Sequence, residues 1–119
     1  MLEDTLVRDN EDIRLLRGGK ADEFNQKAKA GAESIDLKNA NLRLADLRGL
    51  DLHRVDLSGA YLRNADLRGV DFSQANLEGA SLHEAQISGT LFPENLSPEE
   101  IMLSVTHGCR MRVKKTVEI

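Results

Sequence analysis

The chain has 119 residues, enough for one domain. Its low content of aromatic residues (3%) and its net charge of −4 argue against nucleic-acid binding. No apolar run approaches the ~20 residues of a membrane span, and the acidic start lacks the basic and apolar regions of a signal peptide. The one cysteine, Cys109, leaves no internal disulfide. Together these features lead us to expect a cytoplasmic protein without membrane or nucleic-acid partners.

The N-terminal segment, residues 1–34, is polar and carries two helical patterns. Asn10 is a candidate N-cap for the first pattern, and Gly18 and Gly31 are candidate stops for the two. The apolar residues of the two patterns are Ile13, Leu15, Leu16, Ala21, Phe24 and Ala28. We interpret the segment as a helical cap for the part of the chain that follows.

Residues 35–92 repeat with a period of five. The large apolar residues of the twelve units are Leu37, Leu42, Leu47, Leu52, Leu57, Leu62, Leu67, Phe72, Leu77, Leu82, Ile87 and Phe92. A smaller apolar residue lies two positions before each, and usually Asp or Asn one position before, as at Asp46 and Asn76. Neither a helix nor a straight strand keeps a spacing of five on one face, so the chain must turn in every unit. Repeated turns in one direction wind an all-β solenoid with both apolar residues of each unit inside.

The glycines decide how many units close one coil. They occur every ten residues from Gly49 to Gly89, and a coil of twenty residues stacks glycine on glycine and alanine on alanine. A coil of fifteen residues would instead stack Gly49 on Asn64. The sequence therefore predicts four sides, and the twelve units then make about three coils.

The C-terminal segment, residues 93–119, begins with a helix signal. Ser97 is a candidate N-cap, Pro98 suits the first helical position, Glu100 completes a capping box, and Gly108 can end the helix. The tail after it alternates apolar and basic residues and permits a short strand. We interpret both flanks as caps on the open ends of the coil, with a partner-binding helix as the alternative.

The stretch "ANLRLADLRGLDLHRVDLSGAYLRNADLRGVDFSQANLEGASL" resembles the pentapeptide-repeat family, whose motif is A(D/N)LXX. The flank "LLRGGKADEFNQKAKAG" is similar, more weakly, to leaders in bacterial members. The resemblance implies a right-handed quadrilateral β-helix, here of about three coils with short α-helical caps at both ends. Tyr61, Ser81, Gln86 and Leu91 depart from the motif at its Asp/Asn position, the last three where the coil is expected to end.

Catalytic groups are not expected, because leucine and alanine fill the coil and leave no pocket inside it. The three histidines, His53, His83 and His107, are expected to lie far apart. His107 and Cys109 are too few for a zinc site, and "RGGK" is not a complete phosphate-binding motif. We therefore predict a protein that is not an enzyme, with no catalytic residue, cofactor or metal.

The exposed side chains on the outer faces of the coil are the remaining candidates for a binding function. The candidate protein-binding residues are Arg43, Arg48, Tyr61, Arg63 and Arg68. They suggest a small scaffold or protein–protein interaction module with an unknown protein partner, as a monomer or an end-to-end homodimer. The plainer interpretation is a solvated surface of compensating charges.

A different class of function comes from the family resemblance, since some members mimic DNA and inhibit or protect DNA gyrase. Residues 35–92 hold eight Asp and Glu against six Lys and Arg, a net charge of −2. About 14 Å of duplex would carry roughly eight uncompensated charges, so the sequence makes DNA mimicry the second hypothesis.

Overall fold

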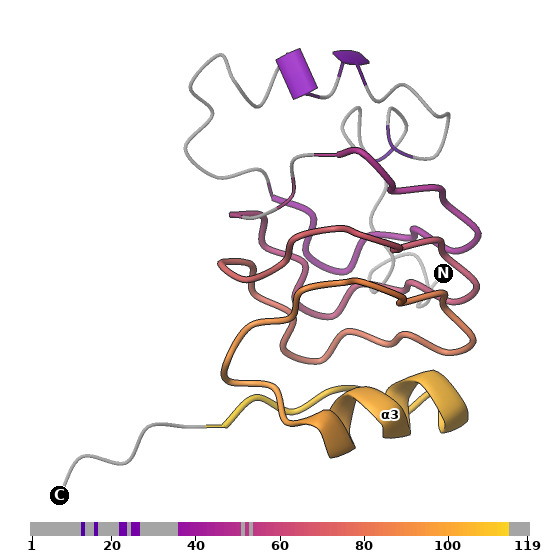
Figure 1. The fold of residues 1–119 in the computed structure, drawn as a ribbon, viewed down its shortest axis with the longest axis vertical. Coiled ribbons are helices and arrows are strands. Elements are labelled where there is room, and N and C mark those ends of the chain that lie inside the picture. Colours follow the sequence, from indigo (N-terminus) through magenta and orange to yellow (C-terminus); the bar gives the residue numbers. More distant parts are fainter. Residues whose placement is uncertain are drawn as a thin grey trace, which may run out of the picture.

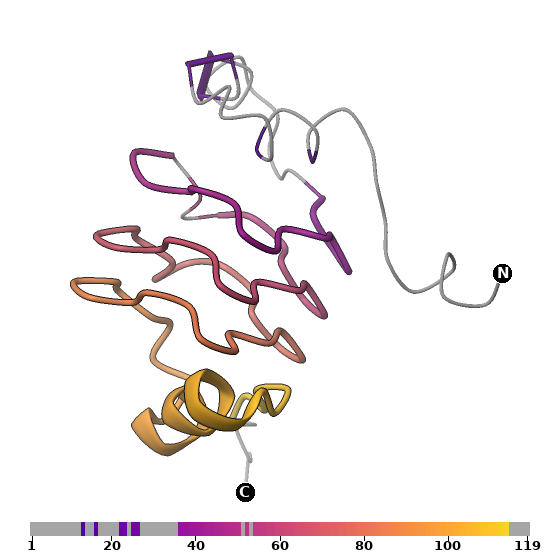
Figure 2. The same ribbon diagram turned by 90° about the vertical axis from the view of Figure 1, so that its right-hand side faces the viewer.

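The structure is a computed structural model, and it describes Ile13, Leu16, Asp22, Glu23, Asn25, Gln26, Leu52 and the ranges 36–50 and 54–114. The coils are stacked one on another, and the helix α3 (Pro98–His107) lies across the end of the stack (Figures 1 and 2). The N-terminal residues that are described lie at the opposite end of the stack.

The register between coils is twenty residues. The parallel bridges join Asp36 to Asp56, Asn41 to Tyr61, Asp46 to Asp66, Asp56 to Asn76, Tyr61 to Ser81, Asp66 to Gln86 and Asp71 to Leu91. Each pair is twenty positions apart, which confirms the twenty-residue coil and excludes one of fifteen. In the described part of the chain these contacts are isolated bridges and not longer strands, because the chain turns in every unit.

The unit from Ala65 to Gly69 explains the repeat, since all five of its N–H groups have an acceptor. In order along the unit, they donate to Leu62 O (3.0 Å), Ala45 O (2.9 Å), Gln86 O (2.9 Å), Asp66 Oδ1 (3.2 Å) and Ser88 O (3.0 Å). Four acceptors are main-chain carbonyls at a corner or on a neighbouring coil. The remaining acceptor is the Asp66 side chain, so the unit needs Asp or Asn to satisfy the N–H two residues later. Gly69 has φ +73°, which a turn of type II requires at this position.

The coil interior is apolar, as the sequence predicts. The first ten large apolar residues, from Leu37 to Leu82, are buried together with the small ones from Ala40 to Ala85. Ile87 and Phe92 are partly buried and pack against this core. Burying one such leucine contributes roughly 1.5–3 kcal/mol, so the stacked interior is the main source of stability. Ile35, also expected inside, lies outside the described residues.

The structure describes six residues of the N-terminal segment, all of them helical. Ile13 and Leu16 are helical, buried and part of the core, and Asn25 donates from Nδ2 to Gly49 O at 3.0 Å. The other residues expected in this cap lie outside the described part of the chain: Asn10, Leu15, Gly18, Ala21, Phe24, Ala28 and Gly31.

The C-terminal helix has the predicted ends. Ser97 is its N-cap and accepts at Oγ from the N–H of Glu100 (3.2 Å), Pro98 is its first residue, and Gly108 ends it with φ +75°. The helix also closes the last coil, because Leu82 N donates to Ser104 Oγ at 2.8 Å. A polar side chain thus takes the place of a fourth coil on this side.

The capping-box prediction for Glu100 is wrong in one respect. Its carboxylate accepts from Arg112, with Nη2 to Oε2 at 2.7 Å, and this ion pair lowers the pKa of Glu100. Arg112 reaches it because the tail folds back under the coil, where Gly79 N donates to Met111 O at 2.7 Å and Met111 N to Ala80 O at 2.9 Å. Met111 is buried.

Candidate functional site

One side of the solenoid carries the candidate residues that have no acidic partner among the residues that the structure describes. It consists of positions 41–44, 61–64 and 81–84, stacked by the parallel bridges of Tyr61 to Asn41 and to Ser81. We call Arg43, Tyr61, Arg63 and Arg110 the arginine–tyrosine face. Arg110 comes from the tail behind α3, and sequence reasoning did not place it here.

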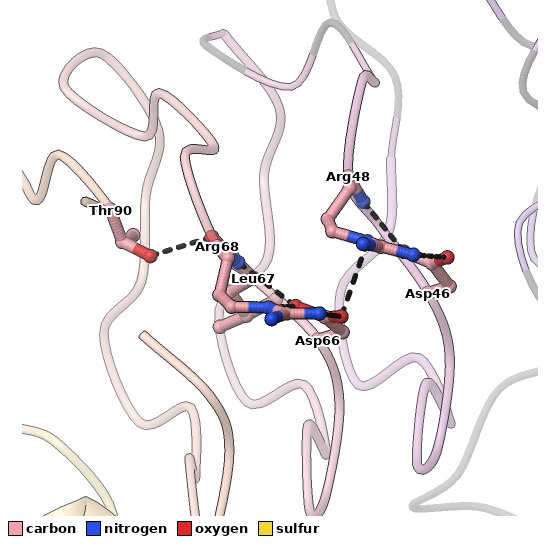
Figure 3. A network of polar contacts seen from close by, with 6 residues as sticks. All are labelled: Asp46, Arg48, Asp66, Leu67, Arg68 and Thr90. Carbon is pink, nitrogen blue, oxygen red and sulfur yellow. Dashed lines mark hydrogen bonds and ion pairs between the residues drawn. The ribbon is translucent and has the colours of Figure 1, made fainter. Parts of the chain in front are cut away.

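The predicted residues Arg48 and Arg68 lie on the next side and behave differently. Arg48 donates to Asp46 at 2.9 Å and 2.8 Å, and Arg68 donates to Asp66 at 2.9 Å and 2.7 Å (Figure 3). Arg48 Nε also lies 3.2 Å from Asp66 Oδ2, so the four side chains form one network across two coils (Figure 3). Thr90, at the corner that follows this side, donates from Oγ1 to Leu67 O at 2.6 Å (Figure 3).

The network shifts the pKa values of its members. The hydrogen bond from Arg48 lowers the pKa of Asp46 from 3.8 to about 2, and Arg68 lowers that of Asp66. In return, the carboxylates raise the pKa of both arginines. These arginines are therefore neutralised within their own side, which makes them poor candidates for attracting an acidic partner.

The difference between the two sides can be traced to one position in each unit. Units of the type Asp-Leu-Arg place a carboxylate beside the arginine two residues later, as in residues 46–48. The units at 41–43 and 61–63 have Asn41 and Tyr61 at that position. Within the described residues no ion pair is recorded for Arg43 or Arg63, because their own units supply no acid.

Tyr61 is held between coil and cap. Arg110 donates from Nη2 to the Tyr61 hydroxyl and from Nη1 to Gly79 O, both at 2.9 Å. The guanidinium carbons of Arg110 and Arg43 lie 5.0 Å and 5.3 Å from the centre of the ring. Both distances allow cation–π attraction. Arg110 is therefore anchored by two hydrogen bonds, whereas no side-chain hydrogen bond of Arg43 is found within the described part of the chain.

A pocket of about 310 Å³ opens on this face. Arg43, Tyr61, Arg63 and Ser81 line it from the coils, and His83, His107 and Gly108 line it beside the cap. The expectation that the histidines lie far apart is therefore wrong for His83 and His107; His53 is outside the described residues. A larger hollow of about 510 Å³ around Phe92 and Pro93 has Glu94 as its one ionisable lining residue.

The charge of the arginine–tyrosine face opposes that of the whole chain. Arg43, Arg63 and Arg110 contribute three positive charges, and Glu84, beside His83, is the one carboxylate among positions 41–44, 61–64 and 81–84. The chain as a whole carries −4. A local cationic surface on an acidic protein favours an anionic group of limited size over a long polyanion.

Nothing in the described part of the chain suggests a metal centre, since it contains no group of three or more His, Cys, Asp or Glu that could hold an ion. Cys109 is a free, exposed thiol. Among the described residues no helix has the length and apolar character that crossing a membrane requires.

Comparison with known proteins identifies the repeat. The family model described as pentapeptide repeats (8 copies) matches residues 33–64 and 56–92, which together span half of the chain. The chain belongs to the pentapeptide-repeat family. Most members of this family are not catalysts. No curated protein and no solved structure gives a significant match.

Three of the four departures from the pentapeptide motif now have local explanations, and nothing in the structure explains Gln86. Leu91 replaces Asp or Asn where the residue two positions later is Pro93, which has no N–H to satisfy. Ser81 uses its hydroxyl to bind Gly108 O at 3.2 Å and so connects the coil to the cap. Tyr61 provides the ring that Arg43 and Arg110 contact. A regular pentapeptide unit would place a carboxylate or amide there.

Proposed function

We propose that this pentapeptide-repeat protein is a non-enzymatic interaction module that binds a protein partner through the arginine–tyrosine face. The scaffold in this proposal is the right-handed, four-sided β-helix that family membership implies. The observation that carries the proposal is the contrast between two adjacent sides. Arg48 and Arg68 are held by acids of their own side, whereas Arg43 and Arg63 lie beside an aromatic ring and a pocket.

Physical chemistry supports a protein as the ligand. Arginine and tyrosine are enriched among the residues that dominate binding energy at protein interfaces. Arg110 holds Tyr61 in one orientation, so binding would order little on this side and would cost less conformational entropy. The packed apolar interior holds the arginine–tyrosine face rigidly and offers no site for a reaction.

The test is a pull-down from the native host with three forms of the tagged protein. The wild type is compared with Arg43→Glu/Arg63→Glu and with the control Lys38→Glu/Arg54→Glu. The control makes the same change in charge at exposed positions on two other sides. We expect one protein to be retained by the wild type and the control and lost with the first variant. Retention by all three forms would place the interface elsewhere.

A supercoiling assay with purified gyrase tests the second hypothesis, DNA mimicry. The net charge of −2 over residues 35–92 and the cationic arginine–tyrosine face both weigh against it. We expect no effect on gyrase. Inhibition at sub-micromolar protein would contradict the proposal and favour mimicry.

A further inference from the structure

Leu44 combines two unfavourable properties. Its φ is +65°, in the left-handed region that bulky side chains rarely adopt, and its side chain is 76% exposed. At the same position of other units the chain has residues that tolerate this conformation, such as Gly49, Gly59 and Asn64, and on the same side of the solenoid it has Glu84 with φ +60°. No packing compensates the strain, because most of the side chain faces solvent.

The surroundings of Leu44 suggest what it contacts. It follows Arg43 in the chain, and its N–H donates to Arg63 O at 2.9 Å, so its backbone lies against both arginines that lack an ion pair in the described structure. An exposed leucine thus lies next to Arg43 in the chain and is bonded through its backbone to Arg63, and both of these arginines line the pocket on the arginine–tyrosine face. The turn imposes a positive φ on this position, so a leucine here costs conformational energy without burying its side chain, and an apolar group of a partner would supply the missing contact.

We infer that Leu44 is an anchor for an acidic protein segment that also carries an apolar side chain. The apolar side chain packs on Leu44, and neighbouring carboxylates pair with Arg43 and Arg63. This inference rests on the proposed function and names the chemistry of the partner. An acidic peptide fits better than a nucleic acid, because the anchor is aliphatic and the chain carries a net charge of −4 that repels a long polyanion.

A random peptide display library, selected against the immobilised full chain, tests the chemistry without assuming a partner. We expect enriched sequences that place an aliphatic or aromatic residue within a few positions of two or more acids. The same selection on Leu44→Asn/Arg43→Ala/Arg63→Ala should not enrich them. Failure to enrich any sequence, enrichment of basic or purely polar sequences, or equal enrichment on the variant would overturn the inference.

A second measurement separates binding from folding. Asn occupies this turn position at Asn64 with φ +57°, so Leu44→Asn should fold and raise the Tm by roughly 4 °C. The same change should weaken binding of a labelled enriched peptide by roughly tenfold. Leu91→Asn is the control, since Leu91 is also exposed, at 58%, but is not among the residues with positive φ. It should change neither quantity much.

The outcomes distinguish the two proposals. If Arg43→Glu/Arg63→Glu releases the partner while Leu44→Asn binds it as well as the wild type does, this inference fails and the proposed function stands. If neither change releases the partner, the proposed function fails with it. If a single-stranded oligonucleotide competes with the enriched peptide at equal concentration, the face recognises polyanions and the inference is again wrong.

Discussion

Arg110 donates a hydrogen bond to the hydroxyl of Tyr61 at 2.9 Å, although 49 positions separate the two residues. Its other terminal nitrogen donates to Gly79 O, which belongs to the last coil. The tail beyond α3 thus spans from the end of the solenoid to the chain's single tyrosine. The cap and the candidate binding face are therefore one structural unit.

Tyr61→Phe should loosen this connection without removing the ring. We expect a loss of stability of about 1 kcal/mol or less, because the lost hydrogen bond is exposed to solvent. Amide hydrogen exchange at Met111 and Arg112, whose N–H groups donate to Ala80 O and Glu100 Oε1, should become faster, while exchange at Leu47 stays as in the wild type. Unchanged exchange at both tail residues would show that the Tyr61 hydroxyl does not hold the tail.

Leu62 and Arg63 test the inward and outward assignments at adjacent positions. Leu62 is fully buried and Arg63 is exposed. Leu62→Asp puts an unpaired carboxylate into an apolar interior and should cost several kcal/mol or prevent folding. Arg63→Ala should change stability by about 0.5 kcal/mol or less. Urea unfolding measures both, and similar losses would contradict the coil described here.

The fold was predictable because the repeat constrains it at every unit. A period of five with glycine every ten residues leaves the twenty-residue coil as the register that stacks like on like. Ser97, Pro98 and Gly108 likewise mark the ends of α3, since caps are local signals. The partner of Glu100 was not predictable, because Arg112 reaches it only when the tail folds back under the last coil.

The site was predictable in part. The five candidate residues lie on two adjacent sides, with Arg43, Tyr61 and Arg63 on one and Arg48 and Arg68 on the next. A signal for the difference between the two sides was present in the sequence, since Asp precedes Arg48 and Arg68 by two positions but not Arg43 or Arg63. Arg110 carried no such signal, because its place depends on the long-range path of the tail.

Ser104 should matter more than an ordinary helix serine. Its side chain is buried and accepts from Leu82 N at 2.8 Å. Ser104→Ala leaves that buried N–H without an acceptor and should cost about 1–3 kcal/mol. Ser88→Ala is the control, because Ser88 is exposed and lies in the coil that contains Leu82. It should cost about 0.5 kcal/mol or less. Equal unfolding midpoints for the two variants would mean that α3 does not close the coil through Ser104.

The same variant also tests how α3 protects the open end. An uncovered coil edge presents unpaired N–H groups that can pair with another chain. Ser104→Ala should therefore increase self-association at high protein concentration, as measured by sedimentation. A variant that is destabilised but stays as monomeric as the wild type would show that the rest of α3 covers the edge without this hydrogen bond.

The acid side of the stability curve should depend on the network of Asp46, Arg48, Asp66 and Arg68. The pKa of Asp46 falls from 3.8 to about 2 on folding, and that of Asp66 is also lowered, in each case chiefly by a hydrogen bond from arginine. A carboxyl group with a lowered pKa binds fewer protons in the folded state than in the unfolded state. Its contribution is therefore fully present above about pH 5 and is lost as the pH falls from about 4 to 2.

Asp46→Asn/Asp66→Asn isolates this contribution. Asn keeps the acceptor for the backbone N–H two residues later, as Asn41 and Asn76 do, but removes the titrating group. We expect the urea midpoint of the wild type to fall more steeply between pH 5 and pH 2 than that of the variant. The side chain of Asp46 is 53% exposed and that of Asp66 is 14% exposed, so solvent screens Asp46 strongly, and the difference should be small and should shrink in about 1 M salt. Parallel pH curves for the two proteins at low salt would show that these ion pairs add nothing to stability.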